Sequence, residues 1–159
     1  MQIGAIIIDT ETLRELDYFS VFVKPTIHPA LSDFFIHLTN ITQEEVERNG
    51  VLFGEALERF LTWAGDLPMY SWGRDPLVLR ENCELYHIPF SVASDRFFDM
   101  RNVFKRAGIE AEKYASSTII EAFGKESPFR AHNGLSDARS ILEGLRELQK
   151  PTSFLHEKR

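Results

Sequence analysis

The chain has 159 residues, of which 43% are hydrophobic, 12% aromatic and 26% charged, a composition typical of one packed globular domain and unlike that of a disordered segment. Its formal net charge of −6 argues against a protein that holds nucleic acid by neutralising phosphates. The single cysteine excludes a disulfide framework, and no apolar run is long enough to span a membrane. We therefore expect a domain over residues 1–149, a tail over residues 150–159, a cytoplasmic location and no membrane partner.

The amino-terminal part predicts a hairpin followed by a helix. Residues 3–8 form a mostly apolar run that suits a buried strand, and residues 19–23 form a second strand. The polar residues 9–15 between them predict the turn. Thr42 and Glu45 have the spacing of a capping box and predict the start of a helix. Asn40, just before it, tolerates the left-handed backbone that such an entry needs.

The rest of the chain alternates helices with short strands. Residues 53–64 repeat apolar side chains at helical spacing, and residues 67–72 predict a strand. Asp75 is expected to cap a helix that runs to Tyr86, with Pro76 at its first position. A short apolar piece at residues 97–98 leads to Asp99 and a helix ending near Ala107, and a further helix is expected from residues 116–117 to residue 123. The last helix carries an apolar stripe at spacings of three and four, namely Ala138, Ile141, Leu142, Leu145 and Leu148. This order predicts an α/β domain.

The most informative polar cluster is His132 with Asp137, five residues later at the mouth of the last helix. Asp137 lies four residues before Ile141, so it is in phase with the buried stripe. A carboxylate on an inward face needs a partner, which a metal ion would supply. His132, on the loop just before, could act there as a general base, because the unperturbed pKa of a histidine side chain lies near neutrality. The alternative is that Asp137 only complements the helix dipole and His132 is a solvated loop residue.

Two further acidic groups could bind ligands, but each also has a purely structural interpretation. Asp75 follows a predicted strand, where α/β proteins place ligands, but an Asp before a Pro is also a good helix cap with no chemistry. Trp72 beside it is more often a core residue than a base-stacking platform. Asp9 and Glu11 would share one face of an extended strand and could bind cations, but they also suit the polar tip of a hairpin.

Taken together, these segments resemble the DEDDh family of 3′-to-5′ exonucleases, and within it the branch that trims structured RNA ends. The resemblance covers about residues 2–149. It implies an RNase H-like mixed sheet flanked by helices, two divalent ions (Mg²⁺ or Mn²⁺) held by four acids, and a histidine that activates the attacking water. The segments that carry it are residues 24–34, residues 38–43, the Ser71-Trp72-Gly73 strand with Asp75, and residues 132–137.

The resemblance assigns roles to individual residues. His132 corresponds to the general base, and Asp75 and Asp137 correspond to two of the four metal-binding acids. Leu38, Thr39 and Ile41 correspond to the segment that lies against the terminal nucleotide; Asn40 stands there in place of the usual glycine.

The chain departs from the family at its front. The family begins with a strand carrying Asp-x-Glu, but Gln2-Ile3-Gly4-Ala5 matches the family's second strand. Asp9 and Glu11 then fall in the turn that follows and only mimic the motif. This interpretation leaves the sheet without its first strand and the metal site with two acids. We therefore expect an exposed strand edge, open to homo-oligomers or to another segment.

The sequence therefore predicts a 3′-to-5′ exonuclease that acts by two-metal catalysis on single-stranded 3′ ends, RNA in preference to DNA, with impaired activity. One alternative is a catalytically inactive or incomplete homologue that binds nucleic acid or protein as a module. A third interpretation recruits Asp9 and Glu11 as replacement metal ligands in a shortened site.

Overall fold

The computed structural model describes residues 1–90, 94–129 and 131–149, so the expected tail over residues 150–159 lies outside the described residues. It begins with the predicted hairpin, in which β1 (Gln2–Ile8) pairs antiparallel with β2 (Glu15–Phe22). The register places Ile3 opposite Val21 and shifts by a bulge after Ile7. The second strand starts four residues earlier than the apolar pattern indicated, because backbone pairing continues into its polar beginning.

Three helices follow the hairpin: α1 (Asp33–Thr39), α2 (Gln43–Asn49) and α3 (Phe53–Ala64). The capping box predicted at α2 is present, since Thr42 accepts from the Glu45 backbone and the Glu45 side chain accepts from the Thr42 backbone. Asn40 has φ 58°, the left-handed conformation expected of it. The sequence analysis missed α1, although Ser32 caps it by accepting the N–H of Phe35.

The second half contains a parallel strand pair and the remaining helices. β3 (Met69–Ser71) pairs with β4 (Phe97–Asp99), and between them lie α4 (Asp75–Leu85) and the 3₁₀ turn η1 (Ser94–Arg96). After β4 come α5 (Arg101–Arg106), the 3₁₀ turns η2 (Ala111–Lys113) and η3 (Ile119–Phe123), and the long helix α6 (Gly134–Gln149). None of the described helices is long and apolar enough to cross a membrane.

Two local predictions were wrong in detail. Asp75 is not the cap of α4: the cap position falls on Arg74, without a side-chain hydrogen bond, and Asp75 is the first helical residue. The helix expected over residues 116–123 is instead a 3₁₀ turn that begins at Ile119. Thr118 ends the preceding turn by accepting the N–H of Ala115, so too few residues remain for a full α-helix.

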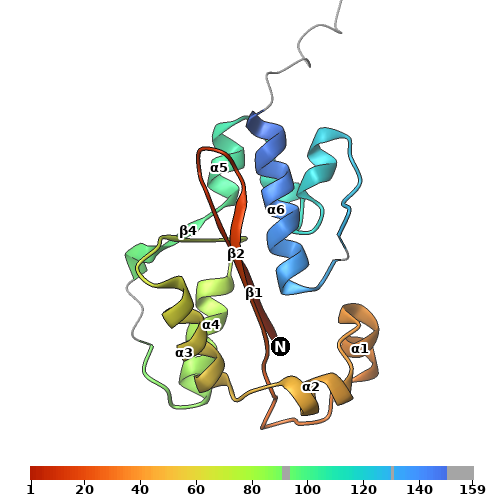
Figure 1. Cartoon of the computed structure of the whole chain (residues 1–159). Coiled ribbons are helices and arrows are strands. Elements are labelled where there is room, and N and C mark those ends of the chain that lie inside the picture. Colours follow the sequence, from red (N-terminus) through yellow and green to blue (C-terminus); the bar gives the residue numbers. More distant parts are fainter. Residues whose placement is uncertain (91–93, 130, 150–159) are drawn as a thin grey trace, which may run out of the picture.

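The fold is α/β with antiparallel and parallel pairs, as expected, but the described strands form two separate two-stranded sheets. Figure 1 shows the β1–β2 hairpin crossing the middle of the molecule, with α3 and α4 on one side and α6 on the other. One core packs α3 and α4 against β1 around Phe53, Leu57 and Leu79, and a second packs α5 and η3 against α6 around Phe104 and Ile119. The two sheets thus lie within one α/β fold, and no hydrogen bond joins their described strands.

Candidate active site

The amino-terminal end of α6 positions Asp137. The Asn133 side chain accepts the N–H of Ser136 at 3.1 Å, as an N-cap residue does, and the Asn133 carbonyl accepts the N–H of Asp137 at 2.8 Å. His132 comes just before this cap, is exposed to solvent and has φ 64°, a left-handed backbone that is uncommon for a non-glycine residue. The sequence analysis missed the role of Asn133, although an Asn three residues before Ser136 is the usual signal of a helix start.

Asp137 lies in an environment that disfavours its charged form. Desolvation raises the pKa of Asp137 above its ordinary value, and the negative charge of Asp75 raises it further, whereas His132 lowers it. One carboxylate oxygen, Oδ1, is buried without a hydrogen-bond partner. Burying an ionised oxygen without a partner costs free energy, so this atom is set up to receive a donor or a cation.

Asp75 reaches the same region from the other half of the fold. It begins α4, directly after β3, and desolvation raises the pKa of its carboxyl, partly offset by the backbone N–H of Trp72. The residue as a whole is open to solvent, so the desolvation concerns the carboxyl end, which faces a cavity that Asp137 also lines. The structure therefore brings together Asp75, His132 and Asp137, which lie far apart in the sequence.

This cavity has a volume of about 720 Å³ and separates the two sheets. Its wall includes the whole of β1 and β3 and the inward face of α6, and its side chains are mostly aliphatic or aromatic. Asp75 and Asp137 are the only charged side chains in this wall, as far as the described residues show. The two carboxylates thus stand at the rim of an apolar space, which explains why desolvation is the main influence on both.

Asp9 and Glu11 lie elsewhere, in the turn between β1 and β2. Asp9 Oδ1 accepts from the backbone N–H groups of Glu11 and Thr12 and from the Thr12 hydroxyl. The hydrogen bond from the Thr12 side chain is the main reason that the pKa of Asp9 is lowered. Glu11 is exposed. These contacts make Asp9 an Asx-turn residue, and neither acid lines the cavity that holds Asp75 and Asp137.

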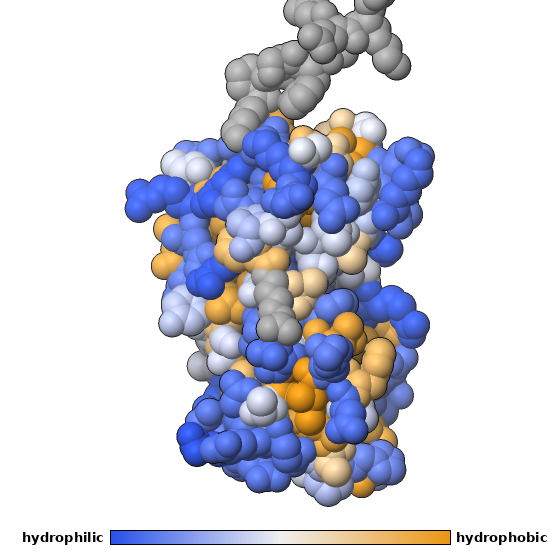
Figure 2. Space-filling model, turned by 90° about the vertical axis from the view of Figure 1, so that its right-hand side faces the viewer, coloured by the Kyte–Doolittle hydropathy of each residue, from blue (hydrophilic) through white to orange (hydrophobic). Residues whose placement is uncertain are grey.

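The residues expected to lie against a nucleotide are at the end of α1. Thr39 donates its hydroxyl to the Phe35 carbonyl and accepts the N–H of Ile41, so it stabilises the end of the helix. Leu38 is exposed, but Ile41 keeps only 4% of its surface open and packs into the interior. Figure 2 shows hydrophobic residues gathered in the lower half of one face of the molecule. Phe34, in α1, is also exposed.

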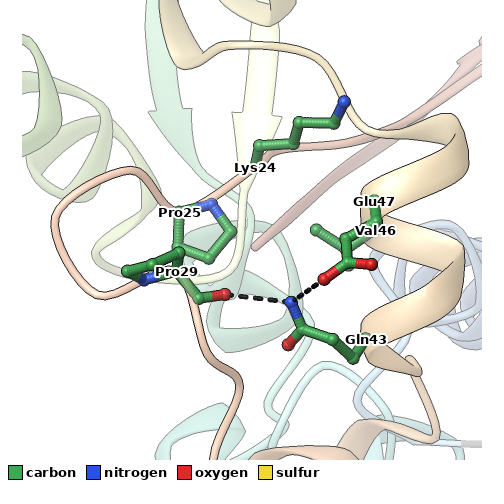
Figure 3. Close-up of a pocket in the computed structure, with 6 residues that line it drawn as sticks. All are labelled: Lys24, Pro25, Pro29, Gln43, Val46 and Glu47. Atoms are coloured by element: carbon green, nitrogen blue, oxygen red, sulfur yellow. Dashed lines mark hydrogen bonds between the residues drawn. The ribbon is translucent and has the colours of Figure 1, made fainter.

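A second, smaller pocket of about 170 Å³ lies at the start of α2, and none of the predicted site residues lines it. Figure 3 shows Gln43 turned towards the loop, where its amide donates to the Pro29 carbonyl; the same amide also donates to the carboxylate of Glu47, four residues further along α2. The Gln43 carbonyl oxygen also accepts the N–H of Leu31. These hydrogen bonds hold the loop before α1 against α2. The pocket between the loop and the helix therefore has a structural explanation and is not assigned a binding role.

The described residues provide only part of a metal centre. The buried, unpartnered Oδ1 of Asp137 and the nearby Asp75 carboxyl are suitable oxygen donors for a hard cation. However, no group of three or more His, Cys, Asp or Glu side chains that could hold a metal occurs within residues 1–90, 94–129 and 131–149. The two described carboxylates do not fit a two-metal centre on their own.

Curated proteins similar to this chain are exoribonucleases. The human "3′-5′ exoribonuclease 1" is 27% identical over 152 residues, which cover 89% of this chain and 43% of the human protein. The mouse protein of the same name is 26% identical over 153 residues, with 44% of its length covered. This chain therefore spans less than half the length of the curated relatives that it matches.

Solved structures share the fold. The nuclease domain of 3′hExo, a DEDDh family member bound to rAMP, superposes with a TM-score of 0.82 at 25% identity, covering 94% of this chain and 80% of that one. Cell-death related nuclease 4 superposes with a TM-score of 0.75 at 16% identity, covering 92% and 55%. The family model described as "Exonuclease" matches residues 1–145. This chain therefore belongs to the exonuclease family, within its DEDDh 3′-5′ group.

Proposed function

We propose that this chain carries the exonuclease site of its family in an incomplete form, and that it acts on the 3′ end of single-stranded RNA in preference to DNA. The observation that carries the proposal is that Asp75, His132 and Asp137 lie close together. Both Asp75 and His132 are near enough to shift the pKa of Asp137, Asp75 upwards and His132 downwards. The exoribonuclease relatives support RNA as the substrate class. The lone cysteine, Cys83, is free and buried, which suits the reducing cytoplasm as the location.

His132 is the residue best placed to activate water. Its exposed ring precedes the helix that carries Asp137, and the Asp137 carboxylate would stabilise the imidazolium once the ring takes a proton. The water oxygen then bonds to the phosphorus of the last phosphodiester, the bond from phosphorus to the 3′ oxygen of the preceding nucleotide breaks, and that 3′ oxygen takes up a proton from solvent. The products are a nucleoside 5′-monophosphate and an RNA with a new 3′ hydroxyl.

The metal requirement explains why we expect weak activity. The DEDDh exonuclease family depends on divalent metal ions, and we propose Mg²⁺ or Mn²⁺ here, with Asp75 and Asp137 as the ligands that this chain contributes. An ion at this site would polarise the phosphate. Since the described residues offer only these two carboxylates near it, the ion would be held loosely.

A 5′-labelled RNA with a single-stranded 3′ tail tests the proposal. We expect slow, metal-dependent shortening from the 3′ end, and His132→Ala should reduce it by about 10²- to 10⁴-fold, the usual contribution of a general base. His87→Ala is the matched control, because His87 is also exposed and has a left-handed backbone, φ 55°. Equal rates for the two variants would contradict the assignment of His132.

A second experiment separates impaired catalysis from a pure binding module. We expect a version that begins with an additional strand bearing Asp-x-Glu to degrade the same RNA far faster than the 159-residue chain. The matched control carries Asn-x-Gln in that strand, which keeps its shape and removes the carboxylates. If the two extended versions were equally inactive while still binding RNA, the chain would be a nucleic-acid-binding module instead.

A further inference from the structure

One side chain binds the start of α6, which lies beside β1 (Figure 1), to that strand. The first backbone N–H groups of a helix have no partner within the helix. The N–H of Gly134 is one of them, and Oε1 of Gln2 accepts it at 2.9 Å. Among the described residues, this is the only hydrogen bond that ties residues 131–137 to a part of the chain outside α6 and the turn before it. Gln2 therefore has no described substitute in this position.

The Gln2 amide is itself oriented by β2. Its Nε2 donates to the hydroxyl oxygen of Ser20 at 3.0 Å. Ser20 stands opposite Gly4, two residues along β1 from Gln2, a diagonal position on the same face of the strand pair. Because the N–H of Gly134 can only donate, the amide must turn its oxygen towards α6, and Ser20 then accepts from the nitrogen. The two hydrogen bonds thus connect β2 through β1 to α6.

The turn that Gln2 holds carries two residues of the candidate site. Gly134 lies two residues after His132 and three before Asp137. Desolvation is the main influence on the pKa of Asp137 and raises it, whereas the charge of His132 and its backbone N–H lower it, so these two residues meet across the turn. The arrangement is unfavourable on its own, because His132 has a left-handed backbone and Asp137 Oδ1 is buried without a partner. It therefore needs support from outside the turn.

We propose that Gln2 is a positioning residue, which holds His132 against Asp137 by fixing the turn between them. Ser20 assists by orienting the Gln2 amide. The helix itself does not need Gln2, since the N–H of Asp137 bonds within the segment, to a backbone carbonyl at 2.8 Å. Without the Gln2 hydrogen bond the turn would move while α6 stayed helical. The consequence for catalysis rests on the proposed function, because a displacement of about 1 Å can cost about 10²-fold in rate.

Gln2→Met tests the proposal, because Met has a similar length but lacks the amide. Hydrogen exchange at single amides is measured by NMR on the whole chain in EDTA, without RNA. We expect exchange about tenfold faster at Gly134, which loses its acceptor, the equivalent of one hydrogen bond. Exchange should also become faster at His132, because the turn moves away from the Asp137 carboxylate. The Asp137 amide, bonded within the segment, should change little.

Gln43→Met is the matched control. The Gln43 side chain also connects two segments, since it accepts the N–H of Leu31 at 2.8 Å and donates to the Pro29 carbonyl at 3.1 Å. It makes no hydrogen bond to residues 131–137 among those that the structure describes. Exchange at His132 and Gly134 should therefore be the same in this variant as in the parent.

Two further variants identify the hydrogen bonds as the cause. Gln2→Glu should restore slow exchange, because one carboxylate oxygen can accept the N–H of Gly134 and the other can accept from the Ser20 hydroxyl. Ser20→Ala should accelerate exchange at Gly134 less than Gln2→Met does, since the amide remains but is no longer oriented. Combined with Gln2→Met, it should add nothing, because both changes act through the same side chain.

The consequence for catalysis is read from the 5′-labelled RNA. Gln2→Met should lower kcat by about 10- to 100-fold with little change in KM, and Gln2→Glu should restore kcat. Unchanged exchange at His132 in Gln2→Met would overturn the proposal. Equally faster exchange at Asp137 would also overturn it, because Gln2 would then stabilise the whole helix start. If the parent does not hydrolyse RNA, the proposed function fails, whereas the exchange results still confirm or overturn the positioning.

Discussion

Gly4 in β1 and Gly134 at the start of α6 lie backbone against backbone. A Cβ atom added to Gly4 would come within 2.3 Å of the Gly134 carbonyl carbon and 2.2 Å of the Leu135 nitrogen, and one added to Gly134 would lie 3.0 Å from the Gly4 nitrogen. The Gln2 side chain reinforces this contact by accepting the N–H of Gly134 at 2.9 Å. The contact fixes the start of α6, and with it His132 and Asp137, on the hairpin.

Gly4→Ala should therefore destabilise the protein by about 1–3 kcal/mol, the usual cost of overpacking, because backbone atoms cannot move aside as a flexible side chain can. The measurement is urea denaturation followed by circular dichroism. Gly54→Ala is the matched control, since its added Cβ would meet only the end of the Ile88 side chain, at 3.0 Å. Equal stability of the two variants would show that the Gly4–Gly134 contact opens without cost.

Arg146 should hold the hairpin turn against the other end of α6. Its guanidinium donates twice to the Leu13 carbonyl, at 3.0 Å and 2.8 Å, and Leu13 is buried with a left-handed φ of 50°. Arg146→Lys keeps the charge but cannot form the paired donors, so we expect a loss of about 1 kcal/mol in the free energy of unfolding. Arg59→Lys, on the exposed surface of α3, provides the comparison. A larger loss at Arg59 would contradict the role given to Arg146.

The raised pKa values of Asp75 and Asp137 predict a pH dependence of stability in metal-free protein. A carboxyl whose pKa is higher in the folded state than in the unfolded state keeps its proton longer when folded, so stability is full below the ordinary pKa of about 3.8 and falls as the pH rises through the folded value. Asp137→Asn should remove its share of this decline and melt at a higher temperature than the parent at pH 7.

Thermal melts in EDTA at several pH values between about 3 and 8 provide this measurement. The comparison variant is Asp66→Asn, which removes an equally charged but exposed carboxylate and should leave the shape of the profile unchanged. A parent whose stability rose steadily over this range, with Asp137→Asn less stable than the parent at pH 7, would show that Asp137 is stabilised in its ionised form.

Local signals in the sequence predicted the elements well where one short-range interaction decides the structure. The Thr42–Glu45 capping box and the left-handed Asn40 were confirmed because each depends on neighbours within three residues. The division of the described strands into two separate sheets was not predicted, because the order of strands along the chain does not fix which edges pair. Helix α1 was overlooked, although the Ser32 cap and the apolar residues after it were visible signals.

Long-range geometry could not be obtained in the same way. The proximity of Asp75 and Asp137 was inferred from resemblance alone, because nothing in either local sequence encodes the packing of α4 and α6 around one cavity. The burial of Ile41 was missed for the same reason: its exposure depends on elements distant in the chain. The environment of Asp9 was easier to predict, since its partner Thr12 is only three residues away.

The turn position of Asp9 and Glu11 gives a direct test of which acids belong to the site. Asp9→Asn keeps the Oδ1 acceptor that binds the Thr12 hydroxyl and backbone, and Glu11 is exposed. The double variant Asp9→Asn with Glu11→Gln should therefore melt within about 1–2 °C of the parent.

The binding of Mn²⁺ by this double variant, measured by calorimetry, should also match that of the parent, because neither acid reaches the cavity of Asp75 and Asp137. Asp137→Asn should weaken Mn²⁺ binding in the same titration, since it removes one of the two carboxylates that the described residues place there. Loss of Mn²⁺ binding in the double variant, together with a more stable metal-free protein, would instead make Asp9 and Glu11 replacement ligands, because removing two mutually repelling acids from a metal site relieves that repulsion.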